Sequence, residues 1–245
     1  MTDIQKAAAP RFVWGYWTTL GWVVVAFALS AGAGFIAVMV LRPEILTSAV
    51  NLMTDGPLIS LSTLVSATVQ VGVLALAARL TGWPAGEYLG LVRPAGRDAV
   101  VAFGALVAFL FAFDAITYLL GRDIVTPFQA DTYRSARAAG TLPLMWLAFV
   151  VAAPIAEEII FRGFLFRGWI RSARNAKPGI VVIAALFAIV HVQYDWFGIM
   201  QVFLIGLALG WARWRSGSTL LTILMHALIN FWGTLQSMVK IEWLS

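Results

Sequence analysis

Apolar residues recur along the chain in long runs that few charges interrupt. About 20 apolar residues cross the roughly 30 Å hydrocarbon core of a bilayer, so such runs are typical of membrane-spanning helices. The pattern predicts an all-α fold, a transmembrane bundle of seven helices, with an eighth span or a re-entrant segment as a second reading. The seven predicted spans are Phe12 to Leu41, Leu58 to Ala78, Ala99 to Leu120, Leu142 to Ile160, Gly179 to Val192, Trp196 to Ala212 and Thr219 to Val239.

The composition supports a membrane location. Of the 245 residues, 61% are hydrophobic and 12% are charged, against about 45–50% and about 25% in soluble domains. No polar stretch is long enough for a separate soluble domain, so residues 1–245 are expected to form a single integral membrane domain. The chain has no cysteine, which excludes disulfides and thiolate chemistry. The first expected partner is therefore the lipid bilayer.

Basic residues in the loops beside the apolar runs account for the net charge of +5, and this pattern fits membrane topology and anionic lipid rather than nucleic acid. With the N-terminus in the cytoplasm, twelve basic residues fall on the cytoplasmic side and five on the other. Cytoplasmic loops are enriched in Lys and Arg, so we expect a cytoplasmic N-terminus, an external C-terminus and a bacterial inner membrane. The twelve are Lys6, Arg11, Arg79, Arg93, Arg97, Arg162, Arg167, Arg171, Arg174, Lys177, Arg213 and Arg215, and the five are Arg42, Arg122, Arg134, Arg137 and Lys240.

The segment from Phe161 to Arg174, after the fourth predicted span, mixes aromatic and basic residues. At 3.6 residues per turn, Arg167, Arg171 and Arg174 fall on one face of a helix. We expect this segment to lie in the cytoplasmic interface as a topology anchor, with its arginines reaching the lipid headgroups.

Charged side chains near the end of the fourth span are the first candidates for chemistry. An ionisable residue at the bilayer centre costs roughly 2.5–3.5 kcal/mol on insertion scales, so such residues usually mark function. Glu158 precedes Arg162 by four residues, which predicts an ion pair along the helix. Glu157 points about 100° away and is the freer carboxylate, which suits a general base. The alternative is that both glutamates only cap a cytoplasmic helix end.

The only two histidines of the chain fall in predicted spans. His191 follows Phe187 by four residues and His226 precedes Asn230 by four, so each pair is expected to share one helix face. A single membrane histidine often serves only as polar glue between helices. Two of them together with the glutamate pair favour a functional site. Asp114, in the third span, is expected either to line the same cavity or, as the favoured reading, to pair with an arginine near a helix end.

Two carboxylates, two imidazoles and an amide suit hydrolysis by an activated water molecule. A glutamate takes the proton of the water, one histidine orients that water or holds a metal, and histidine with asparagine stabilises the oxyanion. No serine, cysteine or threonine is clearly placed beside a base, so a covalent acyl-enzyme is not indicated. Glu157, His191 and His226 also offer the ligand types of a zinc site, although the HExxH arrangement is absent. Zinc is thus one reading and a metal-free site the other.

In this order, these residues resemble the motifs of a known family. The patterns EExxxR, FxxxH and HxxxN occur on separate predicted spans and use both histidines. The segment 142–235 is similar to the CPBP family of intramembrane glutamic or metalloproteases, which includes type II CAAX prenyl proteases of the Rce type and bacteriocin-processing proteins. The spans 12–41, 58–78 and 99–120 match only as generic apolar helices.

The resemblance implies an intramembrane endopeptidase of the CAAX-protease type, with a catalytic cavity open toward the cytoplasm. It implies a peptide or protein substrate, either C-terminally lipidated or bacteriocin-like. The roles it implies are Glu157 as general base, His191 as the residue that orients the water, His226 and Asn230 as oxyanion stabilisers, and Glu158, Arg162 and Phe187 as supports.

Two other classes of function are compatible with the same residues. One is a non-proteolytic membrane partner, such as a bacteriocin immunity or secretion factor. The other is a proton-coupled transporter, in which the glutamates and histidines would relay protons. Transporters of that kind often carry inverted repeats, and no repeat is found in this sequence. We therefore favour the protease.

Overall fold

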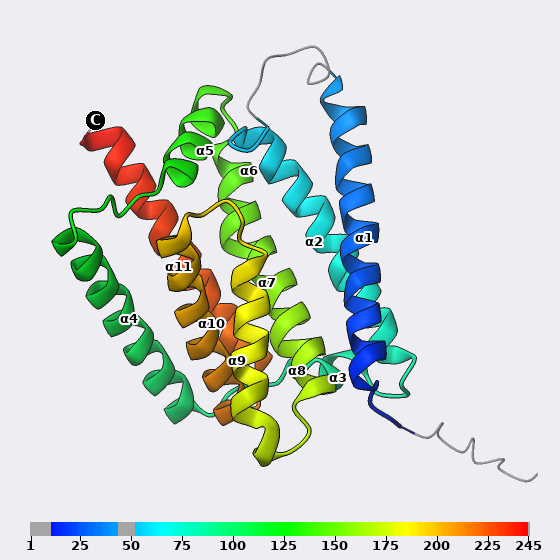
Figure 1. Cartoon of the computed structure of the whole chain (residues 1–245). Coiled ribbons are helices and arrows are strands. Elements are labelled where there is room, and N and C mark those ends of the chain that lie inside the picture. Colours follow the sequence, from blue (N-terminus) through cyan, green and yellow to red (C-terminus); the bar gives the residue numbers. More distant parts are fainter. Residues whose placement is uncertain (1–10, 44–51, 245) are drawn as a thin grey trace, which may run out of the picture.

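The computed structural model describes residues 11–43 and 52–244, so Lys6 of the charge count lies outside the described residues. All regular elements within these ranges are helical, which confirms the predicted all-α class (Figure 1). The N-terminal half contains α1 (Tyr16–Leu41), α2 (Gly56–Arg79), the short α3 (Ala85–Tyr88) and α4 (Gly96–Leu119). Helices α1 and α2 pack against each other as a pair.

A continuous helix from Leu142 to Trp169 crosses the centre of the bundle. It alternates between α-helical and wider π-helical turns, and π-helical turns often occur at functional sites. Its parts are α6 (Leu142–Trp146), the π-helical η2 (Leu147–Ala152), α7 (Ala153–Glu158), the π-helical η3 (Ile159–Leu165) and α8 (Phe166–Trp169). The two glutamates of the predicted site therefore lie at the end of α7, between two π-helical stretches.

Three further helices complete the bundle: α9 (Ala173–Ile189), α10 (Trp196–Ser216) and α11 (Thr219–Trp243). Helices α9 and α10 approach closely because of Gly206 and Gly210. A Cβ atom at Gly206 would lie 3.0 Å from the Cβ of Ala184, and one at Gly210 would lie 2.8 Å from the Cγ2 of Ile180. Small residues of this kind let helix backbones come together in membranes.

Five helices among the described residues are long and apolar enough to cross a membrane, rather than the seven that the sequence predicts. They are Tyr16–Leu41, Gly56–Arg79, Gly96–Leu119, Leu142–Trp169 and Trp196–Ser216. The fifth and seventh predicted spans correspond to α9 and α11, which are not among the five. Helix α9 has 17 residues, and the second half of α11 is interrupted by polar residues such as Asn230 and Gln236. Polar residues that face a cavity lower the hydropathy of a helix without exposing it to water.

The prediction that the segment from Phe161 to Arg174 lies in the interface is wrong for its first half. The central helix continues through this segment as far as Trp169, and Phe161, Arg162 and Phe164 are buried. A new helix, α9, begins at Ala173, where the side chain of Asn175 accepts a hydrogen bond from the backbone of Ser172. The aromatic residues that suggested an interface thus belong to the core.

Helix α5 (Pro127–Ala138) was not predicted from the apolar runs, because it is amphipathic and too short to span a membrane. Thr126 and Gln129 cap its first turn reciprocally. It lies at the end of the bundle where α1 finishes and α11 ends (Figure 1, green). We call this the α5 end and the opposite one, where α1 begins and α3 lies, the α3 end.

Candidate active site

Glu158 and Arg162 form a fully buried ion pair, as the four-residue spacing predicts. The Arg162 Nη1 atom lies 2.9 Å from Oε1 of Glu158, and both side chains are 0% exposed. Arg162 also donates from Nη2 to the carbonyl oxygen of Gly206 on α10, at 3.1 Å. A buried charge is tolerated when it is both paired and hydrogen-bonded, so this pair holds the central helix to α10.

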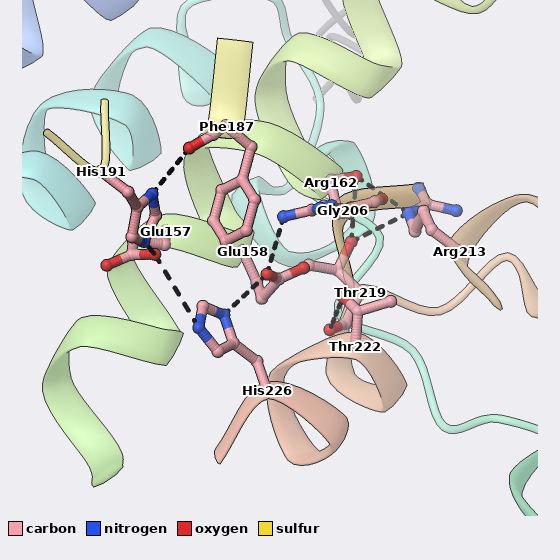
Figure 2. A network of polar contacts seen from close by, with 10 residues as sticks. All are labelled: Glu157, Glu158, Arg162, Phe187, His191, Gly206, Arg213, Thr219, Thr222 and His226. Atoms are coloured by element: carbon pink, nitrogen blue, oxygen red, sulfur yellow. Dashed lines mark hydrogen bonds and ion pairs between the residues drawn. The ribbon is translucent and has the colours of Figure 1, made fainter. Parts of the chain in front are cut away.

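Arg213 and Thr219 extend this pair into a network across three helices. Arg213 donates from Nε to the carbonyl oxygen of Arg162 and to the hydroxyl of Thr219, both at 3.0 Å. The Thr219 hydroxyl donates in turn to the carbonyl oxygen of Leu89 at 2.6 Å. We call Glu158, Arg162, Arg213 and Thr219 the buried network (Figure 2).

Phe187 separates the buried network from the two histidines. The Arg162 guanidinium lies 4.4 Å from the centroid of the Phe187 ring. The His191 and His226 rings contact the same phenyl group edge-on, with centroids 4.7 Å and 5.6 Å away. Figure 2 shows this ring between Arg162 on one side and His191 on the other. The phenylalanine of the FxxxH pattern therefore positions both imidazoles.

His226 is oriented by Glu158. Its Nδ1 atom lies 2.9 Å from Oε1 of that carboxylate. A carboxylate with Arg162 at hydrogen-bond distance is an acceptor, so Nδ1 of His226 carries the proton and donates. The opposite nitrogen, Nε2, lies 3.9 Å from Oε2 of Glu157. Glu158 thus directs His226 toward Glu157.

His191 lies just beyond α9 rather than inside a helix, which corrects the prediction. Helix α9 ends at Ile189, and the following turn is closed by a hydrogen bond from the backbone of Tyr194 to the carbonyl oxygen of His191. The Nδ1 atom of His191 lies 2.7 Å from the carbonyl oxygen of Phe187. A carbonyl only accepts, so Nδ1 is the donor and Nε2 is directed elsewhere. That Nε2 atom lies 3.7 Å from Oε2 of Glu157.

Glu157 is the point on which both imidazoles converge. Its Oε2 atom is buried and has no hydrogen-bond partner among the described residues. Its side chain is 29% exposed, whereas that of Glu158 is 0% exposed. We call Glu157, His191 and His226 the cavity group. It brings one carboxylate oxygen and two imidazole nitrogens to one place, from α7, from the turn after α9 and from α11 (Figure 2).

Asn230 lies one turn after His226 on α11. Its Nδ2 atom donates to the carbonyl oxygen of Phe149, in the π-helical η2, at 2.8 Å. Only one of the two amide hydrogens is needed for this bond. The side chain also lines the cavity described next.

A cavity of about 310 Å³ extends from the cavity group toward the α5 end. At its deep side lie Glu157 and His226, and at the other side lie Thr126 and Phe128, at the start of α5. Amide and hydroxyl groups are frequent in its wall, and none of the described residues that line it is a lysine or arginine. The lining residues with acidic, amide or hydroxyl side chains are Thr63, Asp114, Thr126, Gln129, Tyr133, Glu157, Gln193, Tyr194, Gln201, Asn230, Thr234, Gln236 and Ser237.

Asp114 lines this cavity, and the favoured prediction that it pairs with an arginine is wrong. It accepts hydrogen bonds from the Trp232 indole at 2.9 Å and from the Gln236 amide at 2.6 Å. Both donors lie on α11, whose second half faces α4. The carboxylate therefore ties α4 to the wall of the cavity.

The cavity group matches zinc in the type of its donors but not in their arrangement. Imidazole nitrogens and a carboxylate are ordinary zinc ligands. Within residues 11–43 and 52–244, however, no three His, Cys, Asp or Glu side chains are grouped in a way that could hold a metal ion. The requirement for zinc stays a prediction, and no chemical step below is built on it.

Comparison with known proteins supports the resemblance that the three motifs suggest. Residues 139–232 match the family model described as type II CAAX prenyl endopeptidase Rce1-like. The match covers 94 of the 245 residues, so it is this segment, and not the whole chain, that is similar to the Rce1-like family. The Rce1-like family is one of intramembrane proteases, and the matched segment contains all of the predicted site residues.

Two curated relatives are similar to parts of the chain. UPF0177 protein YxdF of Lactococcus lactis subsp. lactis (strain IL1403) is 24% identical over 135 residues, which cover 52% of this chain and 73% of that protein. An uncharacterized 24.3 kDa protein of Escherichia coli is 30% identical over 115 residues, which cover 44% of this chain and 52% of that protein. No solved structure matches the chain.

The direction in which the cavity extends conflicts with one pair of predictions. A cytoplasmic N-terminus and a cavity open to the cytoplasm cannot both hold, because α1 begins at the α3 end and the cavity extends toward the α5 end. The basic loop after Arg162 lies at the α3 end, away from the direction in which the cavity extends. The conflict arises because the sequence does not tell which half of a span a cavity enters.

Tyr194 is a cavity residue that sequence reasoning missed. Its ring stacks on that of His191 with centroids 6.2 Å apart and an angle of 9°. Burial, with a contribution from Glu157, raises the pKa of Tyr194 to about 12. Its neighbour Asp195 accepts a hydrogen bond from the backbone of Gly198 and so caps α10. An aspartate before an apolar run is a helix-start signal, which could have revealed the turn that presents Tyr194.

Proposed function

We propose that the chain is an intramembrane endopeptidase that hydrolyses a peptide bond with a water molecule activated by Glu157. One observation carries this proposal: Nε2 of His191 and Nε2 of His226 lie 3.7 Å and 3.9 Å from the same Glu157 oxygen, at the inner side of a polar cavity. These distances are too long for direct hydrogen bonds. They leave the carboxylate available to a water molecule held between the three groups.

Glu157 acts in this proposal as the general base. It removes a proton from the water while the water oxygen bonds to the carbonyl carbon of the peptide. The resulting tetrahedral species then collapses, the carbon–nitrogen bond breaks, and Glu157 returns the proton to the leaving amine. Proton transfer of this kind contributes typically 10²–10⁴-fold to a rate.

His226 and Asn230 stabilise the negative oxygen of the tetrahedral species. The proton on Nδ1 of His226 is committed to Glu158, so Nε2 can donate only when the ring is protonated. The second amide hydrogen of Asn230 supplies a further donor. His191, whose Nε2 is an acceptor when the ring is neutral, orients the water.

The substrate that we propose is a peptide segment of a membrane-associated protein. The amide and hydroxyl groups of the cavity wall can pair with a peptide backbone. Two substrate classes follow from the family resemblance, a C-terminally lipidated protein and a bacteriocin-like peptide. A bacterial inner membrane is the proposed location.

The test compares the wild-type chain with Glu157→Gln, His191→Ala and His226→Ala, each reconstituted in liposomes with lipidated and unlipidated candidate peptides. Mass spectrometry of the products identifies the cleaved bond. We expect cleavage by the wild type and a loss of at least 100-fold in Glu157→Gln, the lower bound of general-base catalysis. Equal product formation by all four proteins would exclude this chemistry.

A second arm addresses zinc. The wild-type protein is assayed before and after treatment with a chelator, and its metal content is measured. Full activity in metal-free protein is the expected result. Loss of activity that zinc restores would replace the metal-free mechanism with a zinc-dependent one.

A further inference from the structure

The two ends of the bundle differ in their ion pairing. At the α5 end, the described residues contain five basic and five acidic side chains, and all ten take part in five ion pairs. These pairs are Arg42–Asp55, Arg122–Asp195, Arg134–Asp131, Arg137–Glu242 and Lys240–Asp123. The α5 end therefore carries no net charge in the part of the chain that the structure describes.

The α3 end is strongly basic. Its acidic side chains among the described residues are Glu87 and Asp98, of which Glu87 pairs with Arg11 at 3.8 Å. The basic side chains at this end are Arg11, Arg79, Arg93, Arg97, Arg167, Arg171, Arg174, Lys177, Arg213 and Arg215. An excess of this size favours the cytoplasmic side of a membrane, whose anionic lipids attract basic segments.

Aromatic residues at the α3 end hold several of these arginines at one level. Arg11 and Arg167 lie 4.9 Å and 4.8 Å from the centroid of the Trp83 ring, and Arg171 lies 5.2 Å from that of Tyr16. Tryptophan and tyrosine are enriched where a membrane meets water. This arrangement is what an interfacial belt on the cytoplasmic side requires.

The cavity extends to the other end. Its lining residues come from the first half of α2, the second half of α4, the segment from Ile124 to Tyr133, the central helix from Met145 to Glu157, the end of α9 with the turn after it, the first half of α10, and α11 from His226 to Ser237. All these parts lie between the level of Glu157 and the α5 end (Figure 1). The cavity therefore lies on the side of Glu157 that faces the neutral, ion-paired end.

From these observations we propose that the catalytic cavity opens on the non-cytoplasmic face of the membrane and takes peptide segments exposed on that face. This inference rests on the proposed function for the peptide, but the orientation is independent of catalysis. It resolves the conflict between the two topology predictions in favour of a cytoplasmic N-terminus.

The absence of cysteine from the sequence makes the orientation directly measurable. Ala139→Cys, after α5, and Ala95→Cys, before α4, replace two exposed alanines at opposite ends and serve as matched reporters. Bacterial cells that produce the full chain are treated with a membrane-impermeant maleimide, before and after permeabilisation. We expect Ala139→Cys to react in intact cells and Ala95→Cys only after permeabilisation. Reaction of Ala95→Cys in intact cells would overturn the proposal.

A third reporter, Gln201→Cys, tests the mouth of the cavity, because Gln201 lies in the cavity wall on α10. We expect it to react in intact cells together with Ala139→Cys. A Gln201→Cys side chain that reacts only after permeabilisation, or not at all, contradicts an opening at the α5 end.

A peptide-cleavage assay distinguishes a failure of this inference from a failure of the proposed function. The Ala139→Cys and Ala95→Cys chains are reconstituted in liposomes, the two orientations of each are separated by labelling of the outward-facing cysteine, and a candidate peptide is added outside. We expect cleavage when the α5 end faces outward. Cleavage only with the α3 end outward would overturn the inference and keep the protease. No cleavage in either orientation, with labelling as expected, would overturn the protease and keep the topology.

Discussion

Glu157 and Glu158 are neighbours in the chain, yet they belong to two regions with opposite properties. Glu158 is part of the buried network, where Arg162 and His226 both lie 2.9 Å from one of its oxygens. Glu157 is part of the cavity group, and its side chain is 29% exposed, whereas that of Glu158 is 0% exposed. The difference shows how a helix can give adjacent identical residues different tasks: one carboxylate is neutralised and fixed, and the other is left available.

The largest effect, a loss of cleavage rate, is expected for a change in the cavity group. Glu157→Gln removes the proposed base without removing a hydrogen bond to Oε2. We expect the cleavage rate to fall by about 10²–10⁴-fold, with a melting temperature close to that of the wild type. Steady-state cleavage and thermal unfolding in detergent measure the two quantities. A variant that retains its rate would show that Glu157 is not the base.

The second largest effect, a loss of stability, is expected for a change in the buried network. Arg162→Met leaves Glu158 as a buried charge without its arginine, so we expect a loss of about 3–5 kcal/mol in the free energy of unfolding. The double variant Glu158→Leu with Arg162→Met removes both charges and should recover most of that stability. Chemical denaturation in detergent measures each value.

The same double variant also tests whether the buried network positions a residue of the cavity group. It removes the acceptor of His226 Nδ1, so we expect its cleavage rate to stay far below that of the wild type even where stability recovers. Recovery of stability and rate together would show that Glu158 has no part in positioning His226.

A smaller effect is expected at Phe187, which lies between the two regions. Phe187→Leu keeps the apolar volume but loses the ring contacts with His191 and His226, each worth about 0.5–1.5 kcal/mol for an aromatic pair. We expect a reduction of about tenfold in rate and a modest loss of stability. Phe109→Leu, which replaces an aromatic residue far from the site in sequence, is the control and should leave the rate unchanged.

The smallest effect is expected at Tyr194. With a pKa raised to about 12, its hydroxyl stays protonated below that pH and loses no proton over the working range of an assay. We therefore expect Tyr194→Phe to lower the rate only a few-fold and to leave the shape of the pH–rate profile between about pH 6 and 9 unchanged. A new inflection in that range would assign a titrating role to this residue.

The sequence predicts the helical class and the Glu158–Arg162 pair because both follow from local periodicity. It also predicts which residues gather at the site, through the three motifs. It does not predict that His191 lies beyond its helix, because the apolar run continues through Val190 and Val192 after the helix ends. Nor does it predict the bond between Glu158 and His226, which are 68 residues apart. Contacts of this range depend on how helices pack, and periodicity within one helix does not contain that information.

The π-helical turns on either side of α7 give the central helix a tolerance in length. A π-helical turn takes up one more residue than an α-helical turn. The six residues from Leu147 to Ala152 therefore advance the helix by nearly the same angle as five residues in α-helical winding. Deleting one of them would return this stretch to α-helical winding and leave α7 facing almost as it does now. A single-codon deletion here would thus shorten the helix without exchanging the surroundings of Glu157 and Glu158.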